Sequence, residues 1–259
     1  MGGEALVITH DMMVEGRHWR SGADMADVAW KLVAAALSDL AAKGAAPLGV
    51  LVGYTLGEGE ARFVEGLREV LETFRVPLLG GDTVAGDGAR TLGCTAIGRA
   101  THRPVPDRRG ARAGDAVFVT GPLGNAMLGF EGSPSGSVED LAHRRPTPLL
   151  AHGQALAPLV SAMMDVSDGL LLDAWRMASA SRVSFLLDSA AVPVAVPARR
   201  AECLRWGDDY ALLFTAGAEV HLPVAAHWIG VVADDCGSPL VLDGAPLTGP
   251  AGLGYQHDG

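Results

Sequence analysis

Residues 37–45 read LSDLAAKGA and join the end of a predicted helix to the approach of a strand. The helix is predicted over 24–43, where Asp24 is a typical N-cap and Gly44 a typical C-terminal stop. The apolar stretch that follows, at 48–56, is typical of a strand. Helix and strand signals mix along the rest of the chain in the same way, and this mixture predicts an α/β or α+β protein.

The remaining elements follow from the same patterns. Residues 60–75 carry apolar side chains at helical spacing. Further helices are predicted at 148–160 and 169–181, and further strands at 4–10, 91–99, 116–120, 183–188, 210–215, 226–232 and 239–242. A segment rich in Pro, Arg and Gly at 101–114 predicts a boundary between two domains, 1–107 and 108–259, and residues 131–140 are predicted to form a surface loop.

Composition narrows the function. The chain has 259 residues, of which 49% are hydrophobic, so a sizeable core is expected. Its formal net charge of −10 makes it a poor candidate for binding nucleic acid, which requires cations against phosphates. There is no apolar run of the ~20 residues that a membrane span needs and no signal-peptide pattern. We therefore expect a soluble cytoplasmic protein without a membrane partner.

Cysteines and lysines are few. The three cysteines are far apart and form no C-x-x-C pair, which indicates a reducing compartment and argues against zinc and disulfides; they are Cys94, Cys203 and Cys236. The only lysines are Lys31 and Lys43, and we interpret this scarcity as a consequence of genome composition.

The common phosphate-binding motifs are absent from the sequence. Their absence argues against a P-loop NTPase and against a dinucleotide-binding fold. What remains is a set of aspartates at the ends of predicted elements: Asp11, Asp39, Asp82, Asp165, Asp168, Asp208 and Asp209. Taken singly, each has a structural explanation. Asp39 suits an exposed helix position, Asp82 a turn, Asp168 a helix cap, and Asp208 and Asp209 a solvated turn.

Taken together, the aspartates suggest chemistry. Short carboxylates beside glycines suit hard cations, and Mg²⁺ usually shares its shell with waters and substrate phosphates. Clustered carboxylates repel one another unless a cation lies among them. Gly80 and Gly81 would let the backbone approach a phosphate. The pattern predicts a site with several Mg²⁺ ions for a nucleotide. His18, seven residues after Asp11, is a further candidate, with surface packing as the alternative.

The motifs in chain order resemble thiamine-monophosphate kinase, a member of the superfamily of aminoimidazole ribonucleotide synthetase. They are THDMMVEGRHW (9–19), LSDLAAKGA (37–45), GGDT (80–83), GRATHR (98–103), VTG (119–121), DVSDGL (165–170), GDDYALLFT (207–215) and GYQH (254–257). The resemblance covers essentially the whole chain. LSDLAAKGA indicates only the superfamily, whereas VEG-x-H-W behind the first aspartate favours the thiamine kinase.

The resemblance implies a fold and an activity. The fold is a two-domain α/β (α+β) protein of the aminoimidazole ribonucleotide synthetase kind. Its N-terminal domain (1–107) binds ATP and Mg²⁺ and contributes strands to a barrel that spans a homodimer, and 108–259 form the C-terminal α/β domain. The implied reaction is direct in-line transfer of the γ-phosphoryl group of ATP to thiamine monophosphate, a phosphate acceptor. Such transfer depends mainly on positioning and charge neutralisation, and no catalytic side chain acting as a general base is apparent.

Roles are also implied residue by residue. The resemblance implies that the nucleotide is bound by Gly81, Asp82, Arg103 and Ser167, and that the thiamine phosphate is bound by His18, Asp208 and Tyr255. It implies that the Mg²⁺ ligands are Thr9, His10, Asp11, Asp39, Asp82, Asp165 and Asp168. Asp173, the last residue of DVSDGLLLD (165–173), matches no such role and is predicted to be structural.

The chain departs from the family pattern in places. A Gly-Asp-Asp element usual before the first strand, another metal ligand in the family, does not precede residue 4, and we expect the sequence to be a shortened form. His10, Ala36, Trp206 and Ala211 replace a Thr, Asn, Gly and Glu, respectively. These departures leave two alternatives to an active kinase: a non-catalytic nucleotide-binding homologue, and a sister enzyme with another phosphate acceptor.

Overall fold

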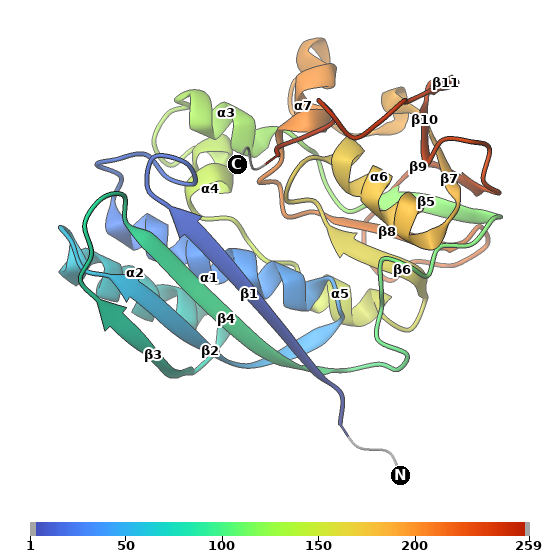
Figure 1. Cartoon of the computed structure of the whole chain (residues 1–259). Coiled ribbons are helices and arrows are strands. Elements are labelled where there is room, and N and C mark those ends of the chain that lie inside the picture. The colour runs from blue at the N-terminus through green and yellow to red at the C-terminus, as the bar shows by residue number, and fades with distance from the viewer. Residues whose placement is uncertain (1–3, 257–259) are drawn as a thin grey trace.

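The computed structural model describes residues 4–256, and Figure 1 shows their arrangement around two sheets. The first sheet has four strands in the order β1-β4-β2-β3, and the second has seven in the order β11-β10-β7-β9-β5-β8-β6. Helices pack on both sheets, so the predicted mixed α/β class is confirmed.

The four-stranded sheet contains β1 (Leu6–Val14), β2 (Ala45–Thr55), β3 (Leu78–Val84) and β4 (Thr91–Ala100). Helices α1 (Met25–Ala41) and α2 (Glu60–Phe74) lie behind it in Figure 1. A buried cluster that includes Leu32, Leu37, Val50 and Leu92 fills the space between the sheet and the helices. Side chains of β1 alternate between this covered face and the opposite face, which is the expected period of two.

The seven-stranded sheet contains β5 (Asp115–Val119), β6 (Val160–Asp165), β7 (Ser184–Leu187), β8 (Leu212–Gly217), β9 (His227–Ala233), β10 (Leu240–Leu242) and β11 (Ala245–Pro246). Helix α6 (Leu170–Ser181) packs on one face through a second apolar cluster. The shorter helices are α3 (Asn125–Glu131), α4 (Val138–Arg144), α5 (Leu150–Leu156) and α7 (Arg200–Trp206).

A third apolar cluster joins the two halves. Ala41 and Ala42, at the end of α1, pack with Leu156 of α5 against Met163 and Phe214 on the second sheet. Helix α1 therefore contacts both sheets, and its Lys31 and Ser38 side chains reach residues of the second half of the chain. Within residues 4–256, no helix is both long and apolar enough to cross a membrane.

The predicted helices at 24–43, 60–75 and 169–181 are confirmed, and Asp24 caps α1 by accepting a hydrogen bond from the Ala26 N–H at 3.0 Å. The predicted helix at 148–160 was too long, because Val160 already begins β6. The apolar run there suits either a helix or a strand, and pairing with β8 makes it a strand. Strand β3 was missed because its glycines disfavour a strand, but parallel pairing with β2 overrides them.

The predicted loop at 131–140 is also partly wrong. Residues 132–137 are non-helical, but α4 begins at Val138, with Ser137 as its N-cap. The Ser137 side chain accepts from the Asp140 N–H at 3.2 Å, and two arginines near the helix end reach Asp27 of α1. These contacts with α1 stabilise α4, which is too short to be detected by periodicity. The domain boundary at 107/108 lies between β4 and β5 and stays a prediction.

Candidate active site

Strand β1 and helix α1 bring three of the predicted metal ligands together. Thr9 and Asp11 are two residues apart on β1, so both side chains face α1. The Thr9 hydroxyl donates a hydrogen bond to Asp39 Oδ2 on α1. Burial, and then the charge of Asp39, raises the pKa of Asp11 to about 7. Asp11 Oδ2 is buried without a hydrogen-bond partner among the described residues, which leaves an oxygen available to a cation.

The end of β6 adds a third carboxylate to this group. Asp165 is buried, and its Oδ2 accepts a hydrogen bond of 2.7 Å from the hydroxyl of Ser38 on α1. Burial, followed by repulsion from Asp39, raises the pKa of Asp165 well above its ordinary value. Asp11, Asp39 and Asp165 thus come from three elements, and the charge of Asp39 disfavours ionisation of the other two, as expected of carboxylates arranged to share cations.

The buried Asp173 side chain holds the turn that follows Asp165. Asp173 Oδ2 accepts hydrogen bonds from the backbone N–H groups of Ser167 at 3.1 Å and Asp168 at 3.0 Å. Asp168 is therefore not the cap of α6, whose first flanking residue is Gly169 with φ 109°. Arg176 contacts both Asp168 and Asp173. The turn holds Asp168 partly exposed and Ser167 exposed, and Asp173 is structural in this arrangement.

The loop 207–210 is locked against the same turn. The Asp208 N–H donates to Ser167 O at 2.8 Å, and the Tyr210 N–H donates to Val166 O at 2.9 Å. Asp208 and Tyr210 both adopt left-handed backbone, with φ of 58° and 50°. Such conformations are strained for residues other than glycine and persist only where the surroundings enforce them. A Cβ at Gly207 would lie 2.4 Å from Ser167 O, so this close approach requires glycine.

Lys31 and its neighbours surround the Asp208 carboxylate. Lys31 Nζ lies 2.5 Å from Asp208 Oδ2, and the Tyr210 hydroxyl donates to Asp208 Oδ1 at 3.1 Å. His143 Nδ1 lies 3.8 Å from Asp208 Oδ2. Burial, followed by the charge of Lys31, lowers the pKa of His143 to about 4. The ring is therefore neutral near pH 7, and the ion pair of Asp208 is with Lys31.

The two aromatic candidates for the thiamine phosphate lie beside each other. The rings of His18 and Tyr255 are 6.5 Å apart in an edge-to-face arrangement. His18 Nδ1 accepts a hydrogen bond from the Val14 N–H at 3.0 Å, and the Tyr255 N–H donates to Asp168 O at 2.8 Å. Asp208 and Tyr255 thus both donate backbone hydrogen bonds to carbonyl groups of the 166–168 segment. His257, at the end of the GYQH motif, lies outside the described residues.

The structure does not bring the remaining candidates into this group. His10 lies on the opposite face of β1 from Thr9 and Asp11, with its Nδ1 2.8 Å from Thr95 Oγ1. Gly81 and Asp82 lie on the edge strand β3 and are exposed, and Asp82 Oδ1 accepts from the neighbouring Thr83 N–H. Arg103 is exposed just after β4. Their roles stay predictions.

The carboxylate group fits Mg²⁺ in its donor chemistry. The oxygens are hard ligands, and the unpartnered Asp11 Oδ2 with the raised pKa values of Asp11 and Asp165 indicates a place where positive charge is favourable. No three His, Cys, Asp or Glu side chains between residues 4 and 256 already form a metal-binding group. Because Mg²⁺ keeps waters and substrate phosphates in its shell, a site of this kind does not require three protein ligands for one ion.

Sequence reasoning missed Lys31 and His143. Lys31 is buried on α1 seven residues before Ser38, so both side chains lie on the same helix face. Lys31 could have been singled out from this spacing, because the sequence has only two lysines and one of them shares a helix face with the LSD motif. His143 gave no such signal, because only the packing of α4 on α1 brings it to Asp208.

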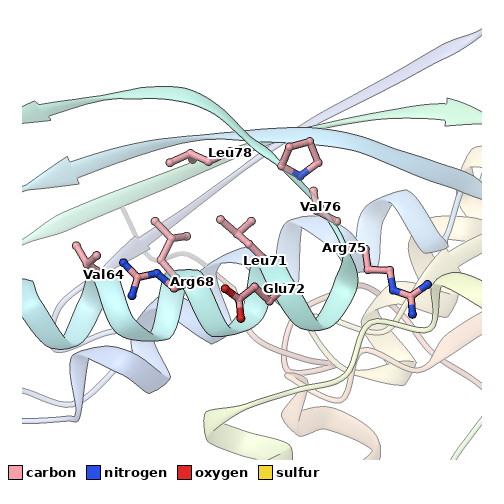
Figure 2. A pocket seen from close by; sticks show the side chains of 9 residues that line it. Val64, Arg68, Leu71, Glu72, Arg75, Val76 and Leu78 are labelled. Carbon is pink, nitrogen blue, oxygen red and sulfur yellow. The ribbon is translucent and has the colours of Figure 1, made fainter.

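An apolar groove lies elsewhere, between α2 and the start of β3 (Figure 2). Val64, Leu71 and Leu78 line it, with Arg68 and Glu72 at its edge. None of the residues predicted to bind metal, nucleotide or substrate lines this groove. The chemistry therefore points to the carboxylate group between the two sheets.

The chain is similar in sequence to known proteins along most of its length. Residues 1–100 match the family model of the N-terminal domain of AIR synthase related proteins, and residues 112–228 match that of the C-terminal domain. The chain is 35% identical over 293 aligned positions to a thiamine-monophosphate kinase of Salmonella typhimurium, and the match covers 98% of this chain and 87% of the relative.

Solved structures are similar over the same extent. A thiamine-monophosphate kinase from Stenotrophomonas maltophilia K279a is 30% identical with a TM-score of 0.85, covering 94% of this chain and 87% of that one. AaThiL complexed with AMPPCP and TMP is 26% identical with a TM-score of 0.88, covering 98% of this chain and 88% of that one.

Proposed function

We propose that this chain, which belongs to the thiamine-monophosphate kinase family of the AIR synthase related proteins, transfers the γ-phosphoryl group of ATP to thiamine monophosphate and forms thiamine diphosphate. The observation that carries the proposal is the convergence of Asp11, Asp39 and Asp165 from β1, α1 and β6. A group of converging carboxylates, of which Asp11 and Asp165 have raised pKa values, suits a reaction between two phosphates that must be brought together by cations.

We assign Mg²⁺ to Asp11, Asp39, Asp165 and Asp168, with Thr9 beside them. When bound there, Mg²⁺ ions neutralise charge on the transferring phosphoryl group and orient it. Ser167, exposed on the turn that Asp173 shapes, is our candidate contact for the nucleotide, and Gly81, Asp82, Arg103 and His10 remain candidates supported by the motif match alone.

The acceptor is assigned to the residues that contact the backbone of this turn and their aromatic neighbour. Asp208 is held in place by its backbone hydrogen bond to Ser167 and by Lys31, and His18 and Tyr255 supply neighbouring aromatic surfaces. In this arrangement the protein positions the acceptor phosphate against the donor. Direct in-line transfer needs no covalent intermediate, and no general base is assigned.

We also propose a homodimer formed through the face of the first sheet that α1 and α2 leave uncovered in Figure 1. Apolar side chains are exposed there on three strands: Leu6, Ile8, Met12, Leu51 and Val84. Ile8 is 65% exposed, which is unusual for a strand residue in an apolar row and favours a covering partner. His10 and Asp82 lie on this same face, so in such a dimer they would lie at the interface.

Ile8→Glu tests the dimer, since sedimentation should then show a monomer where the parent chain shows a dimer. If both sediment as monomers, the proposed interface is wrong. We further propose a cytoplasmic location, supported by the free thiols of Cys94, Cys203 and Cys236.

The test of the activity is direct. The chain is incubated with ATP, MgCl₂ and thiamine monophosphate, and thiamine diphosphate and ADP are measured by chromatography. We expect both products in equal amounts, none in EDTA and none when thiamine replaces the monophosphate. ATP binding by calorimetry with no product would favour the non-catalytic homologue, and ADP formation only with another phosphate acceptor would favour the sister enzyme.

A further inference from the structure

Lys31 of α1 and Asp208 of the 207–210 loop form an ion pair that connects the two halves of the chain. The Nζ and Oδ2 atoms are 2.5 Å apart, and the two side chains are 6% and 32% exposed. His143, the next side chain at Asp208, is neutral because burial lowers its pKa. The positive charge that Asp208 contacts is therefore that of Lys31.

The two partners differ in mobility. Asp208 sits on left-handed backbone whose N–H is bound to Ser167 O, and Tyr210 holds its second carboxylate oxygen. Lys31 reaches the pair through a flexible four-carbon chain with three donors. Lys31 is thus the partner that can redirect its charge over a short distance while Asp208 stays in place.

The substrate carries the same two charges as the pair. Thiamine monophosphate has a cationic thiazolium ring that carries the phosphate on a two-carbon arm, and a phosphate monoester is largely dianionic near pH 7, since its second pKa is about 6. This phosphate must approach both ATP and the carboxylates of the metal group. A buried cation beside the acceptor lowers that repulsion.

We propose that Lys31 binds the acceptor phosphate, and that the Lys31–Asp208 pair makes the site select phosphorylated over unphosphorylated thiamine. Thiamine monophosphate replaces both halves of the pair, because its phosphate meets Lys31 and its cationic part meets Asp208. Thiamine replaces only one half and leaves Lys31 buried without a counter-ion, which is unfavourable. The selectivity for a phosphate acceptor would then reside in Lys31.

Calorimetry on the full chain tests this, with thiamine monophosphate and thiamine as the two probes in the presence of MgCl₂. Lys31→Gln keeps a donor for Asp208 but removes the charge, and Lys31→Arg keeps the charge. Arg62→Gln on α2, where Arg62 is 53% exposed, controls for the loss of one positive charge. Circular dichroism and thermal melting confirm that each variant folds.

We expect the ratio of the Kd for thiamine to the Kd for thiamine monophosphate to fall roughly 10- to 100-fold in Lys31→Gln, the change expected when a hydrogen bond to a charged group is lost. Lys31→Arg should keep most of the ratio and Arg62→Gln all of it. If Lys31 only positions Asp208, Lys31→Gln would weaken the binding of both probes equally or of neither, and that result overturns the inference. If Lys31→Gln does not fold, a Lys31→Arg variant that loses the preference for phosphate while staying folded also overturns it.

This inference rests on the proposed function, and the two fail differently. If the unaltered chain does not bind thiamine monophosphate, the proposed function is wrong. If the unaltered chain binds it and forms product, but Lys31→Gln retains the full preference over thiamine, only the role of Lys31 is wrong.

Discussion

Replacing Asp11 by Asn should stabilise the metal-free protein while abolishing its activity. Burial and the charge of Asp39 raise the pKa of Asp11 from 3.8 to about 7 in the folded chain. Below pH 3.8 the carboxyl is protonated in both the folded and the unfolded chain, so its ionisation does not change the free energy of unfolding. As pH rises towards 7, the unfolded chain loses this proton first, so the free energy of unfolding falls. Asn never ionises. The free energy of unfolding of the variant should therefore exceed that of the unaltered chain by an amount that grows with pH and levels off above 7.

The size of the effect follows from the shift. About three pKa units at ~1.4 kcal/mol each set an upper bound of about 4 kcal/mol. Because the Asp11 side chain is only partly buried, water relaxes some of this penalty, and we expect a difference of about 1–3 kcal/mol in the free energy of unfolding at pH 8. For a chain of this length, that is a rise of several degrees in Tm.

Urea unfolding in EDTA at pH 5 and pH 8 measures the effect, with Asp234→Asn, an exposed loop residue after β9, as the control. The control should lie within ~0.5 kcal/mol of the unaltered chain at both pH values. Adding MgCl₂ and an ATP analogue should stabilise the unaltered chain and leave Asp11→Asn unchanged. An Asn variant that is less stable at pH 8 than the unaltered chain, or a gain that does not grow with pH, would refute the reasoning.

Three further substitutions separate the roles within the site. Asp168→Asn should lower turnover by more than about 100-fold with Tm nearly unchanged, exceeding the loss expected for a group that only orients a metal ligand, and near-normal activity would argue against a metal role. His18→Ala should raise KM for thiamine monophosphate with little change in kcat, since it removes a binding contact; a selective loss of kcat would contradict this. Asp173→Ala should lower the free energy of unfolding by about 2–4 kcal/mol, because two backbone N–H groups and Arg176 lose their acceptor, and an unchanged urea midpoint would show that the turn does not depend on it.

Much of the fold could be predicted because local patterns decided it. The helix 24–43 has a cap, a stop and a continuous apolar face, and the strands of β1, β2 and β4 are apolar runs between turns, so propensity and tertiary structure agree. The predictions failed where pairing decided between two local possibilities. Residues 160–165 became β6 because β8 lies beside them, and 78–84 became β3 despite two glycines because β2 offers a parallel partner.

The candidate site divides in the same way. The order of aspartate motifs along the chain determined the family and the type of chemistry, because short carboxylates at element ends are needed wherever Mg²⁺ meets phosphate. Only the tertiary structure decided which carboxylates share a space. The alternation of β1 separates His10 from Asp11, and the contact of α1 with the second sheet brings Ser38 to Asp165 and Lys31 to Asp208. These pairings join residues more than 100 positions apart, and periodicity along a chain carries no information about such distant contacts.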